Sequence, residues 1–96
     1  MSRVRWHIAA RLEFLDAVDF YESESPGLGA DLLREMDVAL RAVTENPSLG
    51  PKVLGETRRK LVRRFPYSIF YRFDDGLYVL AVAHQKRRPD YWAGRL

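Results

Sequence analysis

Residues 67–83 read YSIFYRFDDGLYVLAVA, and this stretch decides the fold. Its first part, Tyr67–Phe73, is aromatic and β-branched, a composition that favours a strand. Asp74–Asp75–Gly76 follows and predicts a tight hairpin turn, because the glycine adopts a positive φ without strain. Leu77–Ala83 is continuously apolar, as expected of a central strand that is covered on both faces. We therefore predict an antiparallel hairpin in the middle of a sheet.

Two helices are predicted on the N-terminal side of this hairpin. Apolar residues recur at three- and four-residue spacing from Ala9 to about Ser23, and again from about Leu28 to Glu45. Ser25–Pro26–Gly27 breaks the pattern between them. Asn46–Pro47 ends the second helix, because a residue that precedes proline is pushed out of the helical region. The short connection predicts an antiparallel helical hairpin.

The remaining segments complete an α+β fold. Val4–Ile8 is predicted as a first strand, Ser48–Gly55 as a loop and Thr57–Phe65 as a basic strand. The tail through Tyr91 and Trp92 has the pattern of a loop that leads to one helical turn. The predicted order is β-α-α-β-β-β, with the helical hairpin packed on one face of a small, mainly antiparallel sheet. The other face of the sheet is then expected to be free.

Length and composition fit one domain over residues 1–96. The chain is 47% hydrophobic and 30% charged, a globular balance, and 96 residues leave no room for a second core. It contains no cysteine, which excludes a disulfide scaffold and a thiolate nucleophile. No apolar run is long enough to span a bilayer, and the N-terminus lacks an apolar signal core. We expect a cytoplasmic protein without membrane association.

The net charge of +3 conceals an asymmetry. Residues 1–51 carry five basic against nine acidic side chains, whereas residues 52–96 carry eleven basic against four acidic ones. The helices are therefore acidic and the strands basic. Such a separation suggests an anionic partner on one face of the domain, and a merely solvated surface is the alternative.

The basic half holds the candidate functional residues. The binding candidates are Arg58, Arg59, Lys60, Arg63 and Arg64 on one predicted strand, together with Arg87, which follows the last predicted strand. The chemical candidates are His84, Arg88 and Tyr91. Arginines hold phosphates bidentately and a histidine can move a proton, so the set is compatible with metal-free RNA cleavage. A basic strand can equally be a protected sheet edge or a cradle for an acidic protein segment. His84 is also typical of a hydrogen-bonded residue at a strand end, and Trp92 of a side chain that packs the C-terminus onto the core.

Other chemistries are not supported by the motifs. Gly27 and Gly29 precede a helix without following a strand, so they do not form a phosphate loop. His7 and His84 lie on separate predicted strands without metal-ligand spacing, and Ser68 lacks the nucleophile elbow of a serine hydrolase. We expect no metal and no cofactor.

Three runs of residues resemble the RelE/ParE toxin superfamily. They are RFPYSIFY at 64–71, AVAH at 81–84 and RRPDYW at 87–92, and the N-terminal half agrees through Trp6 and the helical hairpin closed by Asn46–Pro47–Ser48. The resemblance covers nearly the whole chain. It implies a small α+β toxin of a type II toxin–antitoxin system, with a plasmid-stabilising role, which a cognate antitoxin from the same operon neutralises by wrapping it.

The superfamily has two branches with different activities. RelE-like members resemble ribosome-dependent mRNA endonucleases, for which Arg58, Lys60 and Arg63 would hold phosphate and His84, Arg88 and Tyr91 would serve proton transfer or charge stabilisation. ParE-like members resemble DNA gyrase poisons without catalysis of their own. The sequence ends in WAGRL rather than in the tyrosine of several nucleases, which favours the ParE-like branch. A decayed member that only titrates antitoxin is a third possibility.

Overall fold

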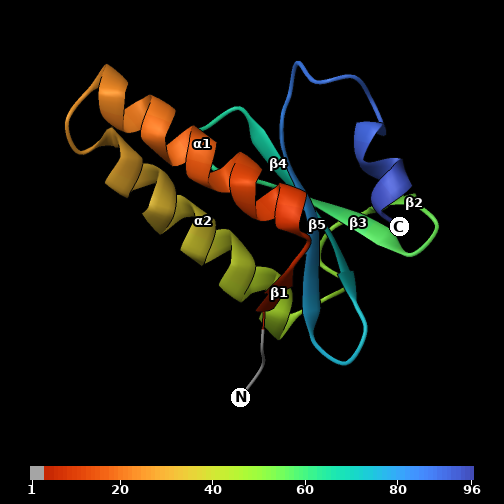
Figure 1. The fold of residues 1–96 in the computed structure, drawn as a ribbon. Coiled ribbons are helices and arrows are strands. Elements are labelled where there is room, and N and C mark those ends of the chain that lie inside the picture. The colour runs from red at the N-terminus through yellow and green to blue at the C-terminus, as the bar shows by residue number, and fades with distance from the viewer. Residues whose placement is uncertain (1–3) are drawn as a thin grey trace.

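The computed structural model describes residues 4–96 and shows one sheet with a helical hairpin on it (Figure 1). The elements in chain order are β1 (Val4–Trp6), α1 (Ile8–Glu24), α2 (Leu28–Glu45), β2 (Lys52–Leu54), β3 (Thr57–Leu61), β4 (Tyr67–Phe73), β5 (Leu77–His84) and the short 3₁₀ helix η1 (Tyr91–Arg95). Within residues 4–96, no helix combines the length and the apolarity needed to cross a membrane.

The sheet has the strand order β1-β5-β4-β3-β2. β1 pairs with β5 in parallel, and every other neighbouring pair is antiparallel. The β4–β5 turn is tight because Asp75 and Gly76 both adopt positive φ and the Asp74 N–H donates to the Gly76 carbonyl. The predicted α+β fold, with a helical hairpin on a mainly antiparallel sheet, is confirmed.

Two boundaries differ from the sequence prediction. The segment 48–55, predicted as a loop, contains the short edge strand β2. The basic strand predicted over 57–65 ends at Leu61, and a turn follows in which Arg64 has a φ of 72°. The chain must reverse there to start β4 at Tyr67, and Pro66 has no N–H to continue a ladder.

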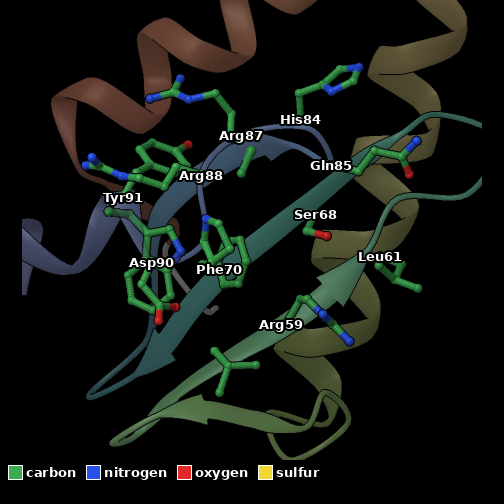
Figure 2. Close-up of a pocket in the computed structure, with 14 residues that line it drawn as sticks. Arg59, Leu61, Ser68, Phe70, His84, Gln85, Arg87, Arg88, Asp90 and Tyr91 are labelled. Atoms are coloured by element: carbon green, nitrogen blue, oxygen red, sulfur yellow. The ribbon is translucent and has the colours of Figure 1, made fainter.

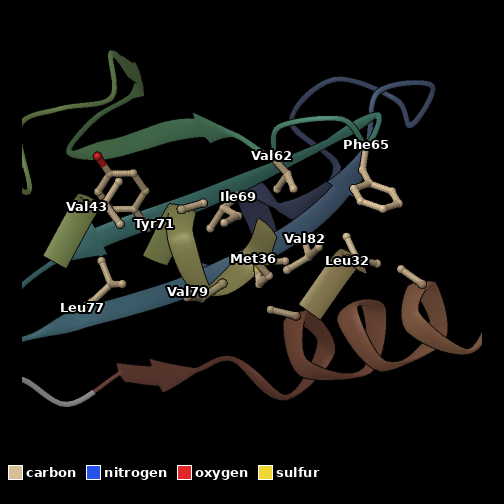
Figure 3. Close-up of a cluster of buried hydrophobic side chains, with 13 residues drawn as sticks. Leu32, Met36, Val43, Val62, Phe65, Ile69, Tyr71, Leu77, Val79 and Val82 are labelled. Carbon is tan, nitrogen blue, oxygen red and sulfur yellow. The ribbon is translucent and has the colours of Figure 1, made fainter. Parts of the chain in front are cut away.

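The hydrophobic core lies between the hairpin and one face of the sheet (Figure 3). Leu32, Met36 and Val43 of α2 are at most 1% exposed and pack in one cluster with Ile69 and Tyr71 of β4. The second face of the sheet takes no part in this cluster, because adjacent residues of a strand point to opposite sides.

The two helices are tied together at their connection. The Glu22 carboxylate of α1 accepts hydrogen bonds from the N–H groups of Gly27 and Gly29, at the start of α2. It thereby caps donors that have no partner inside the helix. Gly29 is required here, since a Cβ at this position would lie 2.9 Å from the Val18 carbonyl oxygen. The predicted antiparallel hairpin thus has a charged cap as well as an apolar interface.

Tyr71 connects the core to the loop that follows α2. Its ring is fully buried, its hydroxyl donates to the Pro47 carbonyl at 3.0 Å, and the Gly50 N–H donates to that hydroxyl at 3.1 Å. One oxygen therefore satisfies two backbone groups that lie more than twenty residues away in the chain. This contact holds the start of the β2 segment against β4.

We expect Tyr71→Phe to lower the free energy of unfolding by about 1–3 kcal/mol, because a buried N–H and a carbonyl lose their partner while the ring is kept. Urea unfolding followed by circular dichroism measures the change. Tyr78→Phe is the matched control, since Tyr78 is less buried and its hydroxyl makes no hydrogen bond within the described residues. Equal effects of the two variants would contradict this role of the Tyr71 hydroxyl.

Candidate functional site

The sheet face opposite the helices is hollowed by a groove of about 420 Å³ (Figure 2). Its floor is formed by β4 and β5, where Ser68 lies opposite Ala83 and Phe70 opposite Ala81. The lining also includes Arg59 and Leu61 of β3, Gln85, and the segment from Arg87 to Trp92. This chain segment and the strands together form an open groove with an apolar floor.

The C-terminal segment covers part of the face that was expected to be free. Trp92 is 1% exposed and stacks on Phe70, with ring centroids 4.8 Å apart and planes inclined by 28°. The predicted turn exists as η1, and Trp92 packs the C-terminus onto the sheet, although on the face opposite the core between sheet and helices. The expectation of a wholly open second face is wrong, because this indole needs the apolar surface of Phe70.

The basic strand β3 does not present all its cations on one face. Arg59 lies opposite Phe70 and lines the groove, whereas Arg58 and Lys60 lie opposite Tyr71 and Ile69, on the side of the helices. Arg58 is moreover engaged locally, since its guanidinium donates to the Gly50 carbonyl at 2.7 Å. The pleat of the strand therefore separates residues that are adjacent in the sequence.

The other two candidates of that cluster lie in the turn after β3. Arg63 is exposed there and does not line the groove. Arg64 turns back to α2 and lies 3.6 Å from a carboxylate oxygen of Asp31 and 3.9 Å from one of Glu35. Of the five cations predicted on this strand, only Arg59 reaches the groove.

The groove receives its other cations from the segment after β5. Arg87 and Arg88 both line it, and the guanidinium of Arg87 lies 3.8 Å from the centre of the Tyr91 ring. This distance is that of a close cation–π contact. Arginines from two distant chain segments thus line the groove from opposite sides, as Figure 2 shows.

His84 lies at the end of β5, at one end of the groove, and it pairs in register with Tyr67, whose ring packs on the helix side of the sheet. Its Nδ1 accepts a hydrogen bond from the Lys86 N–H at 3.0 Å, and its ring packs edge-to-face on Tyr67 at 5.2 Å. These contacts fit the interpretation of a structural residue at a strand end. They leave Nε2 as the ring nitrogen that would serve proton transfer.

The Tyr91 hydroxyl is engaged with a carboxylate. It donates to Glu13 of α1 at 2.7 Å. Burial and this hydrogen bond raise the pKa of Tyr91 far above its ordinary value, because a phenolate would be poorly solvated and would face an anion. A phenol in this setting is a poor source of a catalytic base.

Glu13 is a functional candidate that the sequence analysis missed. Its carboxylate accepts from the Val82 N–H at 3.0 Å and from both terminal nitrogens of Arg95 at 2.9 Å, in addition to Tyr91. Burial raises the pKa of Glu13, but the hydrogen bonds from Arg95, Tyr91 and the Val82 N–H outweigh it and lower the pKa overall. The hydrogen-bond partners of Glu13 lie 69 to 82 residues away in the chain, so no local sequence motif predicts them.

The groove therefore combines three cations with an apolar floor, and His84 lies at one end of it. Within residues 4–96, no three His, Cys, Asp or Glu side chains gather as a metal site. Guanidinium groups over an apolar trough can bind carboxylates or phosphates and, at the same time, bury apolar or aromatic groups.

A known structure has the same fold. The chain is similar to "Chromosomal ParDE TA system from P. aeruginosa", with a TM-score of 0.72 over 88% of this chain and 96% of that chain, at 17% sequence identity. No curated protein matches the sequence.

The family model of the ParE toxin of the type II toxin–antitoxin system, parDE, matches residues 4–89. This match spans β1 to β5 and the start of the groove-lining segment, up to Pro89, and it confirms the resemblance to the RelE/ParE superfamily. The chain belongs to the ParE toxin family of type II toxin–antitoxin systems.

Proposed function

We propose that this protein inhibits growth by poisoning DNA gyrase in the cytoplasm and that a cognate antitoxin neutralises it by placing an acidic segment in the groove. The observation that carries the antitoxin part is that Arg59, Arg87 and Arg88 line one groove. The gyrase part rests on membership of the ParE family and on what the ParE-like branch implies.

The groove suits an extended peptide better than a compact ligand. It is open and runs across β3, β4 and β5, with Phe70 and Ala83 in its floor. Alternate side chains of an extended segment would point into this floor, while its carboxylates meet the arginines at the rim. The acidic residues of such a segment would also offset the positive charge of the strands.

The arrangement of the nuclease candidates supports the non-catalytic branch. Arg58 and Lys60 lie on the side of the helices, and Arg63 lies in a turn outside the groove. The Tyr91 hydroxyl is bound to Glu13. RNA cleavage needs phosphate-binding and proton-transferring groups that converge on one phosphodiester, and these residues do not converge.

A ribosome-dependent mRNA endonuclease is the second candidate function. It is favoured by one observation, namely that His84 lies at the end of the groove that Arg59, Arg87 and Arg88 line. These four side chains would supply phosphate contacts and one proton-transferring imidazole without a metal ion.

The purified protein is expected to leave mRNA intact in a cell-free translation system and to make gyrase accumulate cleaved plasmid. The reason is that the groove binds protein segments without a positioned catalytic base. Primer extension on the mRNA and gel analysis of the plasmid measure the two outcomes. His84→Ala is expected to retain toxicity.

Position-specific cuts in mRNA bound at the ribosomal A site, abolished by His84→Ala in a folded protein, would replace the gyrase proposal with the endonuclease. Unchanged growth on overexpression of the wild-type chain would contradict both functions.

We expect Arg59→Glu combined with Arg87→Glu to weaken antitoxin binding by about tenfold or more at low salt, because two attractive contacts become repulsive. The antitoxin is obtained by pull-down from native extract and identified from the neighbouring reading frame. The loss should shrink as salt is raised, since salt screens exposed charges.

Arg41→Glu combined with Arg63→Glu is the matched control for this experiment. It makes the same change in net charge at exposed positions outside the groove. If the control pair weakens binding as much as the groove pair, overall charge and not the groove determines the affinity.

A further inference from the structure

We propose that Glu13, which lies on α1 outside the groove, is the positioning residue that fixes Arg87 and Tyr91 at the groove wall. This inference rests on the proposed function in one respect, since it assumes that the groove binds an acidic segment. It means that a residue of the helical hairpin positions side chains of the groove.

The position of Glu13 follows from an incomplete strand. β1 ends at Trp6, and the last bond that continues it runs from the His7 N–H to the Val79 carbonyl at 2.9 Å. Beyond this point the edge of β5 still presents the Leu80 carbonyl and the Val82 N–H. Buried backbone groups of this kind need partners.

Glu13 and Arg95 supply these partners together. Arg95 donates to the Leu80 carbonyl at 3.0 Å, and Glu13 accepts from the Val82 N–H at 3.0 Å. The two side chains pair bidentately with each other, and each is 16% exposed. Side chains from α1 and η1 thus take the place of a neighbouring strand and fasten the C-terminal turn to β5.

The same carboxylate holds the groove wall. Its second oxygen accepts from the Tyr91 hydroxyl at 2.7 Å, and it lies 3.9 Å from a guanidinium nitrogen of Arg87. Arg87 in turn stacks on the Tyr91 ring at 3.8 Å. Glu13 therefore restrains Arg87 both through the ring beneath it and by direct attraction, although the side chain of Arg87 is otherwise exposed.

The sign of the effect separates positioning from simple electrostatics. Glu13→Gln removes one negative charge near Arg87, which by Coulomb's law should strengthen the binding of an acidic peptide. Loss of positioning should weaken that binding, because Arg87 and Tyr91 must then be ordered when the peptide binds. The two explanations predict opposite changes.

The test measures the affinity of the full chain for a fluorescein-labelled oligoglutamate peptide at low salt, by fluorescence anisotropy. Glu13→Gln is expected to weaken binding about tenfold, since two restrained side chains become mobile. Asp16→Asn removes the same charge one turn away on α1, where Asp16 is exposed and forms no ion pair among the described residues. This control should bind the peptide as well as the wild type or better.

A double-mutant cycle shows whether Glu13 acts through Arg87. In an Arg87→Gln background, Glu13→Gln should cause little further loss of peptide affinity. The two single variants should also show the same reduced salt dependence of peptide binding. Additive losses, or binding that is unchanged or strengthened by Glu13→Gln alone, would overturn the proposal.

A second readout does not depend on any ligand. In a Trp6→Phe background, Trp92 is the only tryptophan, and its quenching by acrylamide should rise several-fold in Glu13→Gln as the turn loosens. Equal quenching in Trp6→Phe with and without Glu13→Gln would contradict the proposal that Glu13 anchors the turn. The wild type could fail to bind oligoglutamate while quenching still rises in Glu13→Gln. That result would contradict the proposal that the groove binds an acidic segment, and it would support the anchoring of the turn by Glu13.

Where Glu13→Gln does not fold, Tyr91→Phe serves in its place. It removes one hydrogen bond to Glu13 and keeps both the carboxylate and the ring under Arg87. We expect it to weaken peptide binding a few-fold in a folded protein, and unchanged affinity would count against the proposal.

Discussion

The hydrogen-bond ladder between β4 and its two neighbours fixes which side chains reach each face of the sheet. Ile69 and Tyr71 point to the helices and form the core, while Ser68 and Phe70 point to the groove. Because β3 follows the same register, its cations are divided between the two faces as well. The pleat thus sorts one short basic strand into a structural part and a binding part.

A second constraint lies at the edge of β5. β1 is only three residues long, so the edge beyond it is completed by Glu13 and Arg95 instead of by a strand. This solution has a consequence for binding, because η1 carries the groove wall and is fastened through the same carboxylate. The acidic hairpin and the C-terminal turn are therefore joined by a partly buried ion pair at the edge of the sheet.

Most of the fold could be predicted from local patterns in the sequence. The bounds of α2 and β4 agree with the predicted ranges, and the hairpin turn at Asp74–Asp75–Gly76 was marked by its residue types. β2 was not predicted because it is short and lies among glycines and prolines, and the tie from Tyr71 to Pro47 and Gly50 connects it to the core only in three dimensions. A pattern of period two or 3.6 needs several residues to be visible.

The sequence by itself determined the helices, the central strands, the separation of charge and membership of the ParE family, because all of these depend on residue types at short spacing. The tertiary structure alone decided which cations line the groove, that Trp92 covers part of it, and that Glu13 holds its wall. These features depend on strand register and on contacts across some 70 to 80 residues, where only the folded chain brings a carboxylate of the first helix to the last turn.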